Sequence, residues 1–281
     1  MDSAIPRRTL VYSSGRPRFD AVLRHEQRGR ACGIDHTGKR NKVIANTILK
    51  RTRAGKRALI LGLTFPAPAF VEFASALGFD AVNLDGEHGA FTPESVDEMC
   101  RVANAYGMSV TARVPNIRSD TINLYLDRGV QGITGPHVES KEEAQALADA
   151  CLFPPDGKRS WGGRRGTEFH DDVRLAKYGG NPGFAKWANA NMTVLAQIES
   201  KKAWENLDGI LSVKGLTGVA GGPNDFAASL GHPGEPDHPE RVAATADVEK
   251  RARAAGKRAG GGNAVLMVHA TVLAEGRDFV A

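Results

Sequence analysis

Residues 81–88 read Ala81-Val-Asn-Leu-Asp-Gly-Glu-His88, a short apolar run of strand character that is followed at once by Asp85 and His88. Three later runs of the same kind also lead into a charged residue: Val110-Thr-Ala-Arg113, Val194-Leu-Ala-Gln-Ile-Glu199 and Gly218-Val-Ala-Gly-Gly-Pro-Asn-Asp225. In an α/β barrel the catalytic groups lie at the carboxyl ends of the parallel strands, where the loops form one shared pocket. The pattern therefore predicts a barrel and locates its active site at that end.

From about residue 42 the chain alternates strand-like and helix-like segments. Strands are predicted at 58–63, 80–84, 109–113, 131–134, 193–198, 216–220, 257–260 and 278–281. Helices are predicted at 43–53, 68–77, 93–106, 119–128, 140–150, 202–211, 239–255 and 264–275. Thr92 is expected to cap the helix that begins at Pro93. Eight alternations imply parallel strands with right-handed crossovers, so we predict a single (β/α)8 TIM barrel (α/β class) over residues 43–281, with a short N-terminal helix.

The basic residues are concentrated at the N-terminus. Residues 1–57 hold 15 Lys and Arg against 4 Asp and Glu, which leaves 22 basic and 28 acidic residues for the remainder. Such an arm can bind nucleic acid or an anionic membrane, but its arginines lack interleaved aromatics or a recognisable motif. A solvated, poorly ordered extension over residues 1–42 is the favoured interpretation. Asp2, Asp20 and Glu26 disfavour a mitochondrial transit peptide, and an upstream start codon would give the same pattern.

Composition predicts a soluble, cytoplasmic protein without nucleic acid or membrane partners. A length of 281 residues suits one barrel, which typically needs about 250. No apolar run approaches the roughly 20 residues that span a bilayer, and the first residues lack a secretory signal. Cys32, Cys100 and Cys151 have no metal-type or redox spacing, so reduced thiols are expected, with Cys100 in the core.

Five segments occur in a fixed order along the chain: Leu84-Asp-Gly-Glu-His-Gly89, Ala112-Arg-Val-Pro115, Leu126-Asp-Arg-Gly129, Gln197-Ile-Glu-Ser200 and Gly222-Pro-Asn-Asp-Phe226. In this register they resemble the signature segments of the HpcH/HpaI family of metal-dependent 2-oxo-acid aldolases. The resemblance covers about residues 43–281. Relatives continue beyond an eighth strand into a last loop and helix, whereas this chain stops at residue 281.

The resemblance implies a divalent metal cofactor bound by Glu199 and Asp225. Two carboxylates together with water and a chelating substrate suit octahedral Mg²⁺ or Mn²⁺, with Co²⁺ or Zn²⁺ as alternatives. Asp85 is expected to orient the ion through a water molecule. Taken singly, Glu199 and Asp225 would be read as acidic residues that start helices.

Further roles follow for the residues around that ion. Arg113 would hydrogen-bond the oxyanion that develops on the substrate ketone, and His88 is the candidate general acid and base. The resemblance implies that Asp127 orients the histidine of a neighbouring subunit, so a homo-oligomer with shared active sites is expected. Gln197 lies one strand pleat before Glu199 and is expected to face the pocket.

Pro223 and Asn224 are predicted to contact substrate, although Asn224 stands where relatives usually carry a small residue. Residues 156–190 are predicted to form an active-site loop over the barrel mouth, from which Arg164 and Arg165 would bind an acidic aldehyde. Three other histidines are expected to be solvent-facing or structural: His137, His232 and His238.

The sequence therefore predicts a class II aldolase that cleaves a 4-hydroxy-2-oxo acid to pyruvate, or a close 2-oxo acid, and an aldehyde. One alternative within the fold is a citrate-synthase-like or decarboxylating enzyme that uses a similar enolate. A different-class alternative is a catalytically silent barrel that acts as a binding protein. A silent barrel has no chemical need for all of the charged residues found at these strand ends.

Overall fold

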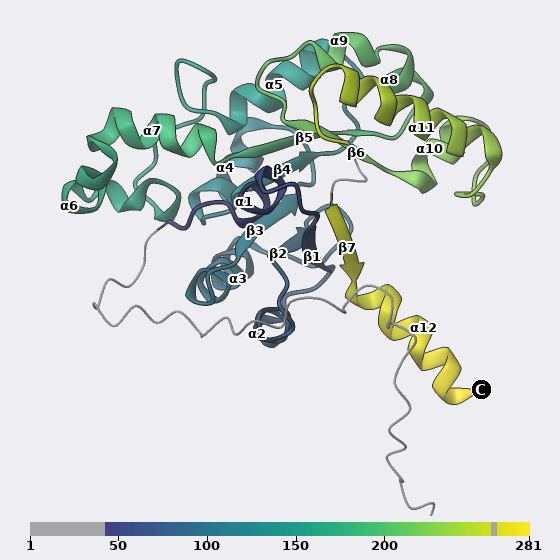
Figure 1. Ribbon diagram of the computed structural model, residues 1–281, viewed down its shortest axis with the longest axis horizontal. Coiled ribbons are helices and arrows are strands. Elements are labelled where there is room, and N and C mark those ends of the chain that lie inside the picture. Colours follow the sequence, from purple (N-terminus) through teal and green to yellow (C-terminus); the bar gives the residue numbers. More distant parts are fainter. Residues whose placement is uncertain (1–42, 260–262) are drawn as a thin grey trace, which may run out of the picture. The chain divides into compact units, whose positions relative to one another are not determined.

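The computed structural model describes residues 43–259 and 263–281 of the chain (Figure 1). The basic extension predicted at residues 1–42 lies outside these residues, so the extension and the domain boundary at residue 42 stay predictions. Within the described residues, parallel strands alternate with helices, which confirms the predicted α/β class.

Seven strands form one parallel sheet in the order β6-β5-β4-β3-β2-β1-β7. Their bounds are Ala58–Leu63 (β1), Ala81–Asp85 (β2), Ser109–Arg113 (β3), Gly132–Gly135 (β4), Thr193–Ile198 (β5), Gly218–Gly221 (β6) and Asn263–Met267 (β7). The first six lie side by side in chain order, the arrangement that successive β/α units of one hand produce. Asp85 of β2 lies opposite Arg113 of β3, so the register brings both side chains to the carboxyl edge of the sheet.

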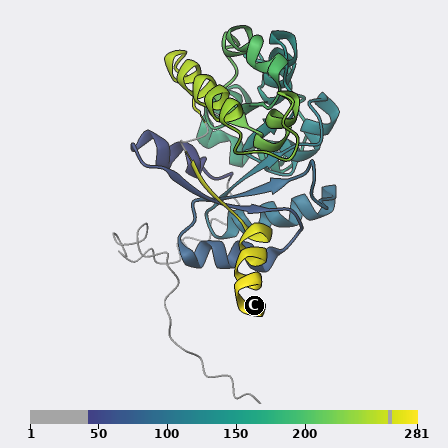
Figure 2. The same cartoon turned by 90° about the vertical axis from the view of Figure 1, so that its right-hand side faces the viewer.

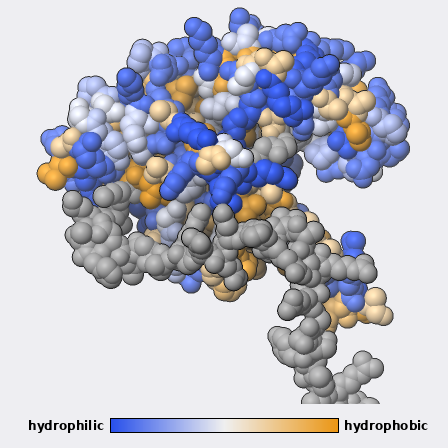
Figure 3. Space-filling model, in the orientation of Figure 1, coloured by the Kyte–Doolittle hydropathy of each residue, from blue (hydrophilic) through white to orange (hydrophobic). Residues whose placement is uncertain are grey.

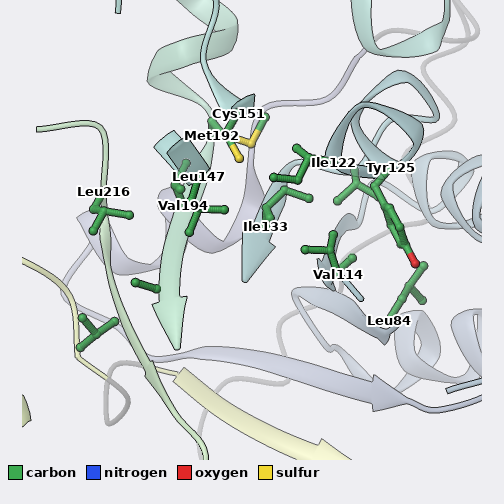
Figure 4. Packing of buried hydrophobic residues seen from close by; sticks show 14 of the residues in the cluster. Leu84, Val114, Ile122, Tyr125, Ile133, Leu147, Cys151, Met192, Val194 and Leu216 are labelled. Atoms are coloured by element: carbon green, nitrogen blue, oxygen red, sulfur yellow. The ribbon is translucent and has the colours of Figure 1, made fainter. Parts of the chain in front are cut away.

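Helices connect the strands and bury apolar faces against them. Their bounds are Thr47–Arg53 (α1), Pro68–Leu77 (α2), Pro93–Ala105 (α3), Ser119–Asp127 (α4), Lys141–Cys151 (α5), Asp172–Leu175 (α6), Gly180–Ala190 (α7), Lys201–Glu205 (α8), Leu207–Leu211 (α9), Pro223–Ser229 (α10), Pro239–Ala254 (α11) and Val268–Val280 (α12). Figure 4 shows Ile133 and Val194 of the sheet close to Ile122 and Leu147 of the covering helices. The outward surface over α5, α8 and α9 is mainly hydrophilic in Figure 3.

Local signals in the sequence correctly place the early elements. Thr92 caps α3 through a reciprocal pair of bonds with Ser95, in which each side chain accepts from the other residue's backbone amide at 3.3 and 2.9 Å. Gly78 ends α2 with φ of 86°, a left-handed conformation that glycine adopts without a steric penalty. Cys100 is fully buried on the inner face of α3, as predicted.

Helix α1 packs across the amino edge of the sheet. The Asn46 side chain donates to the carbonyl oxygens of Gln131 and Asn191 at 3.0 and 2.9 Å, just before β4 and β5 begin. The Thr47 hydroxyl donates to the carbonyl oxygen of Asp80 at 2.6 Å, just before β2. Helix α1 therefore covers the amino edge of the sheet near β2, β4 and β5.

The predictions for the C-terminal part are wrong in three places. Residues 264–267 belong to β7, although the predicted helix 264–275 began there, and only its residues 268–275 lie in α12. Residues 278–280 also belong to α12, where an eighth strand was predicted. A strand was predicted at 257–260. In the part of it that the structure describes, residues 257–259, there is a single β-bridge, between Arg258 and Gly218. Among the described residues the sheet therefore has seven strands and forms a half-barrel, without ladder pairing between β6 and β7.

The open edge of β1 explains the first of these differences. Strand β1 would leave a row of backbone amides and carbonyls unpaired beyond β2, and β7 pairs with it over five residues, from Ala58 opposite Asn263 to Gly62 opposite Met267. Gly62 permits the close approach, because a Cβ there would lie 2.2 Å from the Met267 sulfur. Figures 1 and 2 both show α12 leaving the end of β7 and extending away from the helices α8 to α11.

The segment 156–190 does not cover the carboxyl edge of its own sheet, contrary to the prediction. It holds α6, α7 and two short 3-10 turns, Arg165–His170 (η1) and Ala176–Tyr178 (η2). The buried carboxylate of Glu168 accepts from the Val43 amide at 3.0 Å, and Arg159 donates to the Leu126 carbonyl at 3.3 Å. Both contacts lie toward the amino edge, because Val43 leads into α1 and Leu126 lies in the last turn of α4. The placement of Arg164 and Arg165 as aldehyde-binding residues is therefore wrong for the site of their own chain.

Candidate active site

Arg113 and Asp85 form a two-pronged ion pair at the carboxyl ends of β3 and β2. Arg113 Nε lies 3.0 Å from Asp85 Oδ1, and Arg113 Nη2 lies 2.6 Å from Asp85 Oδ2. Burial alone would raise the pKa of Asp85, but the hydrogen bond and the charge of Arg113 outweigh it and lower that pKa. Both groups are therefore charged, and the guanidinium plane is fixed in orientation.

Glu87 binds the remaining nitrogen of Arg113, although no role was predicted for Glu87. Its Oε2 lies 3.0 Å from Arg113 Nη1, and its Oε1 lies 3.1 Å from His137 Nε2. The carboxylate is 10% exposed, so it is largely shielded from water. Glu87 thus connects the arginine pair to the loop that follows β4.

His137 approaches the buried Glu199 with both its backbone and its ring. The His137 amide donates to Glu199 Oε1 at 2.8 Å, and its ring Nδ1 lies 3.2 Å from the same oxygen. The residue has φ of 50°, a left-handed conformation that costs energy in a residue other than glycine. The prediction that His137 faces solvent is partly right, since the side chain is 64% exposed, but it contacts two carboxylates of the candidate site.

Glu199 follows β5 and is 2% exposed. Gln197 Nε2 donates to Glu199 Oε2, so Gln197 faces the pocket as its strand position predicted. Gly222 leaves the room for this carboxylate, because a Cβ at residue 222 would lie 2.2 Å from Glu199 Oε2. Burial raises the pKa of Glu199, and the negative charges of Glu87 and Asp225 raise it further.

Asp225 lies in the first turn of α10, a helix that the sequence analysis did not predict. Its negative charge contributes to the raised pKa of Glu199, and Gly222, at the start of the same helix, lies against the Glu199 side chain. Pro223 and Asn224 are exposed in the same turn, beside the candidate site. The predicted neighbours Glu199, Gln197 and Asp225 are therefore brought together from β5 and the start of α10.

His88 and Asp127 are not brought together within one chain. The His88 ring is 62% exposed at the rim, with Nε2 3.8 Å from Glu87 Oε2. Asp127 ends α4, which runs antiparallel to the strands and carries it roughly 13 Å back toward the amino edge. There the Oδ1 atom of Asp127 is buried without a hydrogen-bond partner in the described residues, and Arg159 supplies a nearby positive charge.

The charges of this site fit a bound divalent cation. Glu87, Glu199 and Asp225 are mutually repelling carboxylates, and Arg113 already pairs with Asp85 and Glu87. Burying Glu199 beside them is unfavourable, as its raised pKa indicates, and a hard cation would relieve that repulsion. Carboxylate oxygens are the ligands that Mg²⁺ and Mn²⁺ prefer.

We expect Asp85→Asn to remove a contribution to stability that depends on pH. Because the folded-state pKa of Asp85 is lowered, its pairing stabilises the fold above the usual aspartate value of 3.8, and this contribution is lost as pH falls through the lower folded value. Urea unfolding should show the variant less stable by about 1–2 kcal/mol near neutral pH, with the difference vanishing in acid. Asp120→Asn is the matched control, because Asp120 makes the same two-pronged contact with Arg118 on the exposed surface. A difference that persists unchanged in acid would contradict this assignment.

Residues 62–280 match the family described as HpcH/HpaI aldolase/citrate lyase, and the chain belongs to this family. The resemblance inferred from the five motifs is thereby confirmed. The chain is 35% identical over 215 residues to a pyruvate aldolase of Rhizobium etli, which covers 76% of this chain and 82% of that protein. It is also 35% identical over 237 residues to a 4-hydroxy-2-oxovalerate aldolase of Rhodococcus jostii, with 84% and 88% covered.

A solved structure agrees with this assignment. The HpcH/HpaI aldolase from Desulfitobacterium hafniense superposes with a TM-score of 0.74 at 28% sequence identity, covering 84% of this chain and 97% of that one. Among the described residues no helix is long and apolar enough to cross a membrane.

Proposed function

We propose that this protein is a divalent-metal-dependent aldolase that reversibly cleaves a 4-hydroxy-2-oxo acid into pyruvate, or a close 2-oxo acid, and an aldehyde. The observation that carries the proposal is that a fixed arginine and a buried carboxylate site lie at the same edge of the sheet. The arginine is Arg113, held by Asp85 and Glu87, and the carboxylate site is the buried Glu199 together with Asp225. The names of the related proteins support the same reaction class.

The reaction breaks the bond between C3 and C4 of the substrate. A base removes the proton of the 4-hydroxyl, the C3–C4 electron pair moves to C3 as the aldehyde forms, and the resulting enolate takes up a proton at C3. Charge therefore develops on the 2-oxo oxygen in the transition state, which is where a preorganised site must act. When bound by Glu199 and Asp225, the cation would supply Lewis-acid polarisation of the 2-oxo acid.

The protein's own residues supply the remaining functions. Arg113 donates to the developing oxyanion, and Asp85 and Glu87 keep its guanidinium in one orientation so that little reorganisation is needed. His88, exposed at the rim, removes and returns the proton. Asp85, fully engaged by Arg113, acts as a positioning residue for the arginine as well as for the cation. Gln197 and the His137 amide fix the two oxygens of Glu199.

The direct test is a pyruvate-release assay over a panel of 4-hydroxy-2-oxo acids that differ in the aldehyde portion. We expect release that EDTA abolishes and that Mg²⁺, Mn²⁺ or Co²⁺ restores. Borohydride should trap no substrate adduct, because the mechanism uses no Schiff-base lysine. Full turnover in EDTA, or a trapped lysine adduct, would overturn the proposed mechanism, and an absence of release over the whole panel would overturn the reaction.

We expect the active sites to be shared between subunits of a homo-oligomer. Among the described residues, the carboxylates near His88 are Glu87 and Asp85, and both are engaged by Arg113. Asp127 lies at the end of α4 with a buried Oδ1 that has no hydrogen-bond partner among the described residues. His88→Ala and Asp127→Ala should each be inactive in aldol cleavage while still binding oxalate, a pyruvate analogue. Mixing equal amounts with subunit exchange should restore about one quarter of the sites, since each restored site needs one intact residue from each subunit.

The control for this mixing experiment is a mixture of His88→Ala with Arg113→Ala. Both residues belong to the site of the same chain. In a hybrid of these two variants every subunit therefore lacks either His88 or Arg113, and no activity should return. A fully active monomer by light scattering, or no rescue in subunits shown to exchange, would contradict the shared site.

Three finer features are part of the same proposal. Mg²⁺ or Mn²⁺ is proposed as the resident ion because the ligands are carboxylates. A closed (β/α)8 barrel is proposed for the assembled protein, by the family resemblance and not by pairing among the described strands. A cytoplasmic location, with only small-molecule and self partners, completes the proposal.

A further inference from the structure

The loop between α10 and α11, residues 230–238, is held in one conformation by prolines and backbone bonds. Pro233 and Pro236 lie within it and Pro239 follows it, and each fixes its own φ. The His232 amide donates to the Ala227 carbonyl at 2.9 Å, and the His238 amide donates to the Glu235 carbonyl at 3.0 Å. The two histidines are therefore presented by a constrained turn.

Three side chains of this turn and of the start of α11 come together. One atom from each of His232, His238 and Glu240 lies within 4.8 Å of the others, and no other group of three potential ligands does so among residues 43–259 and 263–281. His232 Nε2 lies 2.8 Å from Glu240 Oε2. All three side chains are at least partly exposed, so an ion can reach them from solvent.

We propose that His232, His238 and Glu240 form a second metal site, which takes a borderline transition-metal ion such as Zn²⁺, Co²⁺ or Cu²⁺. Two imidazole nitrogens and one carboxylate oxygen suit these ions and disfavour Mg²⁺, which demands oxygen ligands. The site is chemically distinct from the carboxylate pair Glu199 and Asp225. It therefore does not rest on the proposed aldolase function.

Two histidine rings lie beside the Glu240 carboxylate, where an ion pair alone would need one. An ion pair between His232 and Glu240 accounts for the 2.8 Å contact, and His238 caps α11 by accepting from the Glu240 amide at 3.3 Å. The rings of His232 and His238 stack with centroids 3.4 Å apart and planes 17° from parallel. The stack brings both rings to one place, and rotation of one ring about its side-chain bonds would direct a nitrogen of each histidine at one ion.

The surroundings supply further negative charge. An open hollow of about 390 Å³ adjoins His238 and is lined by Gly234, Glu235, Pro236, Asp237, His238 and Pro239. The carboxylates of Glu235 and Asp237 offset the positive amino end of α11, which would otherwise oppose a cation there. Coordination through His238 Nδ1 would replace only a long 3.3 Å bond from the Glu240 amide.

An ion at this turn would link α10 to α11. Asp225 lies in the first turn of α10, and the histidine turn follows the last residue of the same helix. Zn²⁺ bound by this loop would stabilise the native state. Added Zn²⁺ should therefore raise the unfolding temperature, whether or not the ion supports catalysis. Figure 1 shows the two helices side by side at the end of the sheet that carries β6.

The test uses the full chain stripped of metal and carrying Glu199→Gln and Asp225→Asn, so that the carboxylate pair is removed. Equilibrium dialysis with Zn²⁺ and visible absorption with Co²⁺ should then show one metal ion bound per chain. A large excess of Mg²⁺ should not displace that ion. Adding His232→Ala and His238→Ala should weaken this binding at least roughly tenfold. His269→Ala is the matched control, an exposed histidine of α12, and should leave binding unchanged.

Glu240→Gln provides a second, milder variant that keeps the side-chain shape, and circular dichroism checks that each variant is folded. It should also weaken Zn²⁺ binding, because one ligand charge is lost. Unchanged Zn²⁺ and Co²⁺ binding in the folded histidine variant would overturn the proposal. Loss of thermal stability in that variant with full metal binding would assign the three side chains to an ion pair.

Discussion

Glu199→Gln and Asp225→Asn should each lower the rate of aldol cleavage by roughly a thousandfold or more. Each substitution removes one anionic ligand from a site in which only these two carboxylates are proposed to hold the cation. A thousandfold loss corresponds to about 4 kcal/mol of transition-state stabilisation, within the range that a Lewis-acid cation supplies. Pyruvate release measures the rate, and calorimetric titration with Mn²⁺ measures binding.

The same Glu199→Gln change should stabilise the metal-free protein. Burial raises the pKa of Glu199, so the folded state disfavours its charge, and a neutral amide of the same shape avoids that penalty at neutral pH. Gln197 can turn its amide to keep the contact. We expect a higher unfolding temperature without metal together with lost activity, and Glu205→Gln, an exposed carboxylate on α8, should change neither property. Wild-type turnover by Glu199→Gln would show that the carboxylate pair is not the metal site.

Arg113→Lys should lower the turnover number by roughly 100- to 1000-fold, comparable to the loss of one oxyanion donor. A lysine ammonium keeps the charge but makes one point contact in place of the three nitrogens that Asp85 and Glu87 hold. Binding of oxalate should weaken much less than turnover falls, because the arginine acts on charge that develops during the reaction.

Arg118→Lys is the control, because Arg118 makes an equivalent two-pronged contact with Asp120 at 3.1 and 2.6 Å. That pair is exposed, with 73% and 64% of the two side chains accessible, so its substitution should alter neither rate nor stability measurably. Equal and small effects from both substitutions would mean that Arg113 is a structural cation and that the oxyanion is stabilised elsewhere.

Much of the fold was predictable because its signals are local. The strands β1 to β5 are short apolar runs bounded by turn residues or charges, and Thr92 and Gly78 mark helix ends through their own side-chain and backbone preferences. The C-terminal residues carry no comparable signal. The run Asn263-Ala-Val-Leu-Met267 suits a helix or a strand equally, and the unpaired edge of β1, a tertiary feature, decides between them.

The site was predictable where a charged residue lies at or just past the carboxyl end of a strand. Asp85 and Arg113 end their strands, Glu199 directly follows β5, and Asp225 lies four residues past β6. His137 also follows a strand, after Gly135 and Pro136, and the same rule would have found it. Its left-handed backbone has no signal in the sequence, because only about a few per cent of non-glycine residues adopt that conformation, although histidine does so more often than most. The position of residues 156–190 depended on long-range contacts such as Glu168 to Val43, which periodicity does not reveal.

Residue 137 contacts Glu199 with its backbone amide and with its side chain, and only the second contact depends on which residue stands there. The 2.8 Å bond comes from the backbone amide, which every residue except proline would supply. The imidazole adds a 3.2 Å approach to the same Glu199 oxygen and reaches outward to Glu87 at the solvent-exposed rim. Position 137 is therefore suited to library design, since glycine or asparagine would relieve the backbone strain and other side chains would reshape the pocket wall, while the anchor of Glu199 stays in place.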